Sequence, residues 1–240
     1  MSEDYESLRD EALAEIKRYM DSIGPDKGKK LAYWIKDYAN FLTQEQTFQP
    51  QKLIRYKRGS IVKVHLGYRI GSEEGGLHYA IVMDKNNSIY SPTVTVIPLT
   101  SVKPGVDLSK LHVSNVPIGN EVYTLLASNF NAEIRSAKQH LYEINELQSN
   151  LSTRDDLEAL SRKVEETEKQ ITYCEKMKKE AGRMKQGSIA LVGQITTVSK
   201  IRIYDPRYNK DALSKIRVSS DTLDLLDAKI QELFGSTAKK

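Results

Sequence analysis

The sequence predicts an α+β protein in which a small antiparallel β-barrel carries an N-terminal helical arm, an inserted helical hairpin and a C-terminal helix. Apolar residues repeat every three or four positions before residue 46 and again between residues 129 and 185, but they alternate with polar residues after Gly59. Glycine, proline, asparagine and serine punctuate the alternating segments, as in short strands joined by turns. We therefore divide the chain into an arm (1–50), a barrel with its terminal helix (51–128 and 186–240) and a hairpin (129–185).

Two helices are expected in the arm. Apolar side chains keep helical spacing from Leu8 to Ile23, and the pattern resumes from Leu31 to Leu42. Between these two stretches, "GPDKG" contains the residues that most often interrupt a helix.

Four strands are expected next, in "SIVKVHLGY", "LHYAIVMD", "TVTVIPLTS" and "LHVSNV". A long loop that contains "GSEEGG" joins the first two strands. A closing pair of strands is expected much later, in "GSIALVGQITTVSKIRIYDP". Together these segments predict a small antiparallel sheet or barrel.

The segment between the β blocks is expected to form an antiparallel coiled-coil hairpin. Apolar residues follow a three-four rhythm from Ile134 to Leu151, "STRDDLEAL" supplies a helix N-cap, and the rhythm continues to Ala181. Lys and Glu dominate the other positions, so the simplest interpretation is a solvated projection. Its apolar stripe still needs a partner, either the arm or a second subunit. The chain ends in a capped amphipathic helix, "SSDTLDLLDAKIQELF".

Composition excludes several classes of protein. A chain of 240 residues can bury a full core without cross-links. Its single cysteine, Cys174, cannot form an internal disulfide and has no Cys, His or carboxylate cluster around it at metal-ligand spacing. We expect neither a metal nor a cofactor. The charged N-terminus lacks the apolar region of a signal peptide, and no apolar run reaches the roughly 20 residues of a membrane span. We expect a cytoplasmic protein without a membrane partner.

Basic residues concentrate in the β segments. Residues 51–128 and 186–218 together carry 15 Lys and Arg against 7 Asp and Glu, whereas the rest of the chain is slightly acidic. A surface of this kind suits phosphate groups, because each neutralised phosphate releases counterions. Ordinary solvated surfaces carry similar surpluses, so charge alone leaves both interpretations open.

Several short motifs occur in an order that resembles one known family. They are the Arg58-Gly59 start of the first strand, the Gly71-Ser72-Glu73 and Gly75-Gly76 loop, the "SPTV" entry to the third strand, the "PLTS" exit from it and Gln194 in a late strand. In this order and spacing they resemble the PemK/MazF family of toxin endoribonucleases from type II toxin–antitoxin systems. The resemblance covers the β segments, about half of the chain.

The resemblance implies both a fold and an activity. It implies a partly open barrel, as in the PemK, MazF and CcdB proteins, that cleaves single-stranded RNA without metal and leaves cyclic phosphate and 5′-hydroxyl ends. It also implies a homodimer restrained by a small antitoxin. No acidic, disordered tail is present in this chain, so we expect the antitoxin to be a separate protein.

The resemblance also implies the reacting residues. Thr93 matches the catalytic threonine of the family, but His78 stands where the family has its catalytic arginine. Histidine transfers protons near neutrality, yet it cannot grip a phosphate with two parallel donors as arginine does. The nearest basic candidates for that grip are Lys57, Arg58 and Arg69. The remaining candidates for RNA binding are Ser72, Glu73, Gly75, Gly76, Ser91 and Gln194.

Each of these residues also has a structural interpretation. A histidine at the start of a strand is commonly held by a hydrogen bond, threonine favours strands, and a glycine pair forms turns. Two hypotheses compete with the endoribonuclease. In the first, the chain is a non-catalytic binding module of the same fold, which binds nucleic acid or gyrase without cutting RNA. In the second, it is an interaction scaffold built around the hairpin.

Overall fold

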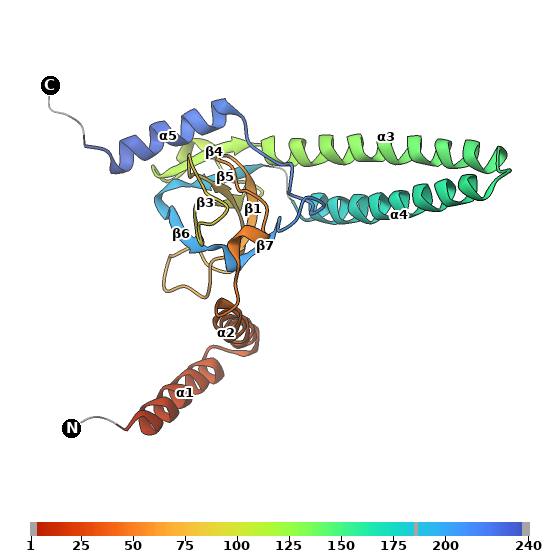
Figure 1. The fold of residues 1–240 in the computed structure, drawn as a ribbon. Helices are drawn as coiled ribbons and strands as arrows, with labels where there is room; N and C mark the ends of the chain where they lie inside the picture. The colour runs from red at the N-terminus through yellow and green to blue at the C-terminus, as the bar shows by residue number, and fades with distance from the viewer. Residues whose placement is uncertain (1–3, 185–186, 237–240) are drawn as a thin grey trace. The chain divides into compact units, whose positions relative to one another are not determined.

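A computed structural model describes residues 4–184 and 187–236 (Figure 1). These residues contain five α-helices and one antiparallel sheet of seven strands, which confirms the α+β class predicted from the sequence. The chain divides into two compact units. The first holds the arm as far as Phe48 together with the loop Leu66–Gly76, and the second holds Gln49–His65 and the chain from Leu77 onward.

The first unit contains the two predicted arm helices, α1 (Tyr5–Ser22) and α2 (Pro25–Glu45). They approach each other closely at Gly28, where a Cβ atom would lie 2.8 Å from the carbonyl oxygen of Met20. Within the same unit, Tyr68 of the loop hydrogen-bonds to Tyr19 of α1. The arm and this loop are therefore joined by at least one polar contact.

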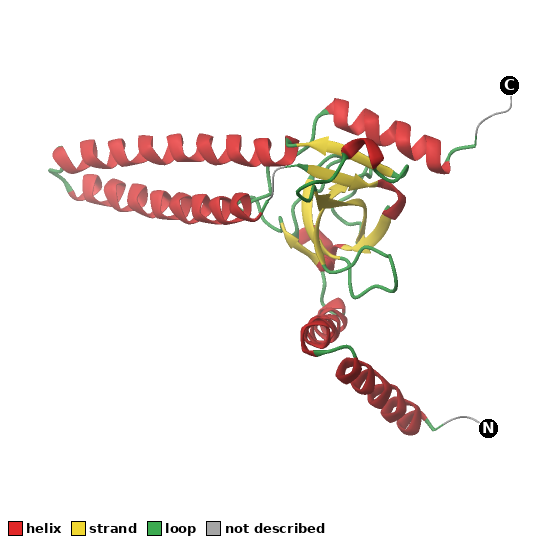
Figure 2. Ribbon diagram, turned by 180° about the vertical axis from the view of Figure 1, so that it is seen from behind, coloured by secondary structure: helices red, strands yellow, loops and turns green. Residues whose placement is uncertain are grey.

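The second unit is built around the sheet. Its strands are β1 (Ile61–His65), β2 (Leu77–Val82), β3 (Thr93–Ser101), β4 (Asn115–Gly119), β5 (Ser188–Leu191), β6 (Thr196–Ser199) and β7 (Ile203–Asp205). Their order is β4-β5-β3-β2-β1-β7, and β6 pairs with β3. The long strand β3 has β2 along one edge, while β5 and β6 share the other edge. The strands curve round a common core (Figure 2).

Two strand predictions were wrong in detail. The fourth strand was expected in residues 111–116, but β4 begins only at Asn115, because His112 and Ser114 form a hydrogen-bonded turn. The late pair of strands is in fact three short strands. A turn at Val192–Gln194 carries the chain from β5, which pairs with the end of β3, to β6, which pairs with its beginning, and β7 then closes on β1.

The hairpin consists of α3 (Glu121–Ser149) and α4 (Arg154–Arg183), which lie side by side and project from the sheet (Figures 1 and 2). Thr153 and Asp156 form the expected capping box at the start of α4. Helix α3 begins before residue 129, where we expected the insertion to start. The other expected boundary, between residues 185 and 186, lies outside the described residues.

The main core lies between the sheet and the helices that cover it. Helix α5 (Ser220–Phe234), capped by Ser219, contributes Leu226, and the first turns of α3 contribute Val122 and Leu126. These side chains pack against strand residues such as Ile81 and Ile97, all fully buried. Removal of this apolar surface from water stabilises the unit by about 25 cal/mol per Å².

Candidate functional site

His78 is the second residue of β2, half-buried and paired with Val64 of β1. Its Nδ1 atom lies 3.2 Å from the carbonyl oxygen of Leu99 in β3. Because a carbonyl oxygen can only accept, Nδ1 carries the hydrogen and donates it. In the neutral ring the lone pair then lies on Nε2, which is the arrangement that a proton acceptor requires.

Thr93 is exposed at the first position of β3 and pairs with Ser199 of β6. Two positions further, Thr95 pairs with Thr197, and their hydroxyl oxygens are 3.1 Å apart. Directly paired residues and those two positions along a strand point to the same face of a sheet. Four hydroxyl groups therefore share one face of the β3–β6 pair, and we had singled out only Thr93 among them.

His78 and Thr93 lie at opposite ends of the β2–β3 ladder. The ladder runs from the pair Tyr79 and Leu99 to the pair Val82 and Val96, and Thr93 lies beyond its far end. The six residue-to-residue steps from Thr93 to Leu99 span about 20 Å of strand at about 3.3 Å per step. The structure thus does not bring these two side chains of one chain to a single point.

The candidate residues of the loop Leu66–Gly76 belong to the first unit. Gly67 and Gly76 close the base of this loop, since the amide of Gly76 donates to the carbonyl of Gly67 at 2.7 Å. Arg69 donates to the Leu66 carbonyl at 2.9 Å and lies 3.6 Å from the carboxylate of Glu73.

The backbone geometry at Gly75 and at Gly76 favours glycine at both positions. A Cβ atom on Gly75 would lie 2.8 Å from the carbonyl oxygen of Gly67, and Gly76 has a φ of +85°. Ser72, in contrast, is exposed. The structural interpretation of the glycine pair as turn formers therefore has direct geometric support.

The two basic candidates before β1 differ sharply. The guanidinium of Arg58 binds the Met83 carbonyl and the carboxylate of Asp227 in α5, and its side chain is 16% exposed. Lys57 is exposed and is the better placed of the two to meet a phosphate. Arg58 instead joins the start of the sheet to the C-terminal helix.

The other two polar candidates, Ser91 and Gln194, lie in turns next to β3 and β6. The hydroxyl of Ser91 donates to the carbonyl of Thr93 at 3.0 Å, and Gln194 is half-buried at the end of a short turn. Beside them lies a residue that we had not singled out, Lys200, which is 1% exposed and donates to the Ser88 carbonyl at 2.9 Å. Burial lowers the pKa of Lys200. Its place in the fold fixes the turn that leads into Thr93.

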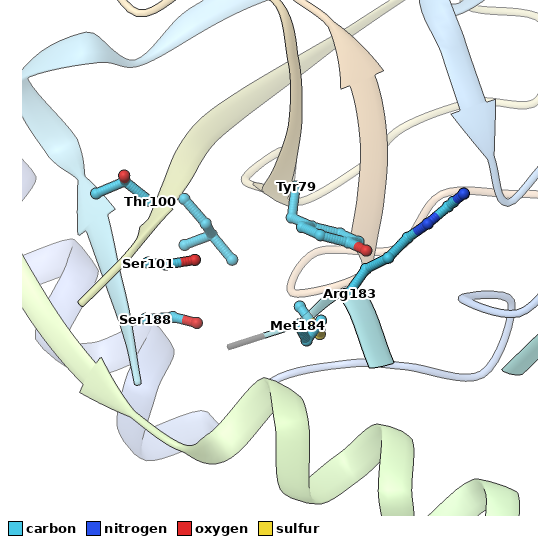
Figure 3. Close-up of a pocket in the computed structure, with 7 residues that line it drawn as sticks. Tyr79, Thr100, Ser101, Arg183, Met184 and Ser188 are labelled. Carbon is cyan, nitrogen blue, oxygen red and sulfur yellow. The ribbon is translucent and has the colours of Figure 1, made fainter. Parts of the chain in front are cut away.

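A small pocket opens beside the Leu99 end of β3 (Figure 3). It is lined by Tyr79, Leu99, Thr100, Ser101, Arg183, Met184 and Ser188. The hydroxyl groups of Ser101 and Ser188 point to the same side, whereas the guanidinium of Arg183 extends away from them (Figure 3). Its Nη1 atom is instead 2.8 Å from Oε1 of Glu180. This pocket therefore lacks the convergent cationic donors that a phosphate site needs.

Glu180, in the last turn of α4, is the centre of a polar cluster on the sheet. Its carboxylate accepts from Nζ of Lys63, from the hydroxyl of Tyr79 at 2.5 Å and from Arg183. Burial raises the pKa of Glu180, but these hydrogen bonds outweigh burial and hold the pKa below its usual value. Burial and the bond to Glu180 raise the pKa of Tyr79. The sequence could not reveal this cluster, because its members come from β1, β2 and the distant hairpin.

Within residues 4–184 and 187–236, no group of three or more His, Cys, Asp and Glu side chains is arranged to hold a metal ion. None of the helices in this part of the chain is both long and apolar enough to cross a membrane. Cys174 is a buried free thiol on α4.

Comparison with known proteins supports the motifs between Arg58 and the end of β3, while Gln194 lies outside the matched residues. Residues 57–155 match the model of the PemK-like, MazF-like toxins of type II toxin–antitoxin systems. The match runs from the approach to β1 through α3 and leaves the arm, most of α4 and the late strands outside it. None of the curated proteins matches the chain.

Proposed function

We propose that this chain, whose residues 57–155 form a PemK-like, MazF-like toxin domain, is the toxin of a toxin–antitoxin system and cleaves single-stranded RNA without a metal ion. The match of the domain is the observation that carries this proposal. The toxins of this family are generally endoribonucleases, and type II systems pair such a toxin with a protein antitoxin. We propose that the antitoxin of this chain is a separate protein.

The proposed reaction is attack of an RNA 2′-hydroxyl on the adjacent phosphorus. The 2′-oxygen loses a proton and bonds to phosphorus, the bond from phosphorus to the 5′-oxygen breaks, and that oxygen gains a proton. Nε2 of neutral His78 takes the first proton, and the resulting imidazolium supplies the second, so the enzyme ends as it began. The products are a cyclic phosphate and a 5′-hydroxyl. The hydrogen bond from Nδ1 to the Leu99 carbonyl supports this assignment, because it holds the ring in the required tautomer.

Thr93 has a different part in this proposal. The hydroxyl face of β3 and β6 offers several donors to phosphate oxygens and ribose hydroxyls of one RNA strand. Because Thr93 and His78 lie at opposite ends of the ladder, we assign Thr93 to holding the strand and His78 to proton transfer. Lys57, exposed before β1, adds positive charge for the phosphates.

Cleavage of a long single-stranded RNA in EDTA tests the proposal. The wild type should release fragments with cyclic phosphate ends. His78→Ala should lower the rate by about 100-fold or more while RNA affinity is kept, since general acid–base catalysis contributes at least this much. Thr93→Ala should instead weaken binding by about tenfold, as expected for the loss of one hydrogen bond to a charged group.

Two matched variants control for the substitutions themselves. His112 is an exposed histidine bound to Ser114, and Thr172 is an exposed threonine on α4. Replacing either with Ala should leave cleavage unchanged. Intact RNA after incubation with folded wild-type protein would overturn the nuclease proposal.

A second candidate is a non-catalytic binding module of the same fold. It is favoured by the hydrogen bond of His78 to Leu99, which also suits a purely structural histidine, and by the missing arginine. This candidate predicts RNA or gyrase binding with no fragments, and His78→Ala would then lower stability rather than any rate.

A further inference from the structure

The hairpin is held together by a seam that mixes apolar and polar residues. On α3 the seam residues, spaced three and four apart and at least half-buried, are Phe130, Glu133, Ala137, His140, Ile144 and Leu147. On α4 they are Leu160, Lys163, Thr167, Gln170, Cys174 and Met177. A coiled-coil seam normally buries apolar residues at these positions. Five of these twelve residues are polar, so the seam buries less apolar surface than a seam with apolar residues at every position would.

A second row of aliphatic side chains lies outside the seam. Ile134 and Leu141 each directly follow a seam residue of α3, and Val164 and Ile171 each directly follow a seam residue of α4. Leu141, Val164 and Ile171 are 48%, 37% and 43% exposed. Leu157, one heptad before Val164, is also exposed, at 55%. Single exposed aliphatic residues are common, but an ordered row along two helices is not.

These residues share one side of the hairpin. The two helices run in opposite directions, so the residue that follows each seam position points to the same side in both. Two polar contacts fix the register of α3 against α4: Gln170 hydrogen-bonds to Glu133, and Lys163 forms an ion pair with Glu143. In this register Ile134 lies at the same level along the hairpin as Ile171, and Leu141 at the same level as Val164. We call the set of Ile134, Leu141, Leu157, Val164 and Ile171 the aliphatic stripe.

The charges beside the stripe indicate what covers it. On α3, Lys138 lies one turn from both Ile134 and Leu141, on the outer edge of the stripe. On α4, Glu168 lies one turn from both Val164 and Ile171, on the opposite edge and at nearly the same height. One edge is thus basic and the other acidic. We propose that the stripe packs against the same stripe of a second copy of this chain, forming a four-helix bundle.

The edge charges also fix the orientation of the two copies. If the two-fold axis runs parallel to the hairpins, α3 of one copy faces α4 of the other, and each Lys138 meets the Glu168 of the other copy. If the axis runs across the hairpins, α3 faces α3 and like charges meet. Opposite pairing is favourable and like pairing is costly at such an edge. The hairpins therefore lie parallel, with their tips near Asn150 together.

The molar mass of the full chain in solution tests this proposal, and it does so without reference to RNA cleavage. The wild type should be a dimer, and Leu141→Glu and Val164→Glu should each give a monomer. Tyr142→Glu is the matched control, because Tyr142 is 59% exposed on α3 but points away from the stripe, and it should remain dimeric. A charge swap sharpens the test: Lys138→Glu should raise the dissociation constant about tenfold, and addition of Glu168→Lys should restore it.

A cysteine at the tip distinguishes the two orientations. Ser152→Cys should form a disulfide-linked dimer under mild oxidation, because parallel hairpins bring the two tips together. Hairpins packed in opposite directions would separate the tips by tens of ångströms, since α3 alone is about 40 Å long at about 1.5 Å per residue. A monomeric wild type, a dimer unaffected by both glutamate variants, or no cross-link from a Ser152→Cys dimer would overturn the proposal.

Discussion

Lys63 and Glu180 lie 117 residues apart in the sequence, yet Nζ of Lys63 is 2.9 Å from Oε2 of Glu180. The lysine belongs to β1, and the glutamate to the last turn of α4. Their side chains are only 13% and 10% exposed, so water screens the pair weakly. The pair joins the base of the hairpin to the sheet, on the strand next to His78.

Removing one member of this pair should destabilise the second unit strongly. Glu180→Ala leaves Lys63 with a buried charge and no carboxylate, which typically costs about 3–5 kcal/mol. Unfolding in urea, followed by circular dichroism, measures this loss. Glu165→Ala, which breaks an exposed pair with Lys169, is the control and should cost far less, because water and salt screen an exposed pair. Equal effects of the two substitutions would contradict the structural role assigned to Glu180.

Asp205 predicts a pH-dependent stability. Burial raises the pKa of this carboxyl to about 6, against a backbone hydrogen bond from Leu213 that lowers it. In the unfolded chain the carboxyl titrates near 3.8, so the folded state holds the proton more tightly between these values. The tighter binding of this proton stabilises the folded state fully below about pH 3.8, and this stabilisation is lost as the pH rises through about 6.

Asp205→Asn keeps an acceptor for the amide of Leu213 but removes this titration. Relative to the wild type, the variant should gain about 3 kcal/mol between pH 4 and pH 7, the equivalent of about two pKa units. Thermal unfolding across that range measures the gain, and Asp155→Asn on the exposed surface of α4 supplies the comparison for loss of one acidic residue. Parallel curves for wild type and Asp205→Asn would refute the assignment.

The sequence revealed the elements of this fold better than the contacts among them. Helical and alternating periodicity predicted both arm helices, the hairpin and the first three strands, because those patterns depend on near neighbours. The exchange of partners along β3 depends on Val192–Gln194, a short turn inside an apolar run that reads as continuous strand. Likewise, Glu180 looked like one more charge on a solvated helix until the fold placed it beside β1.

Two helix glycines should respond oppositely to the same substitution. Gly28 lies so close to the Met20 carbonyl that Gly28→Ala forces α1 and α2 apart, whereas Gly182 of α4 has open space around its Cβ position. Gly182→Ala should stabilise its helix by about 0.5–1 kcal/mol, because alanine loses less backbone entropy. Hydrogen exchange should show faster exchange in the arm for Gly28→Ala and slower exchange in α4 for Gly182→Ala. Faster exchange in both would contradict the open environment of Gly182.

Arg58 and Lys57 should separate stability from RNA binding. Both precede β1 and look alike in the sequence, but only the guanidinium of Arg58 is engaged, with Asp227 and the Met83 carbonyl. Arg58→Met should therefore lower the free energy of unfolding by about 1–3 kcal/mol, because partly buried acceptors lose their donor. Its effect on RNA affinity, and on the salt dependence of that affinity, should be small.

Lys57→Met should behave in the opposite way. Its side chain is exposed, so the loss of stability should stay within about 0.5 kcal/mol. If Lys57 neutralises one phosphate of a bound strand, the slope of log affinity against log salt should fall by about 0.7, the value for one contact with a single strand. Filter binding at several salt concentrations measures this slope for both variants. A reduced slope in Arg58→Met with an unchanged slope in Lys57→Met would contradict this assignment and would mean that a phosphate of the RNA displaces Asp227 from Arg58.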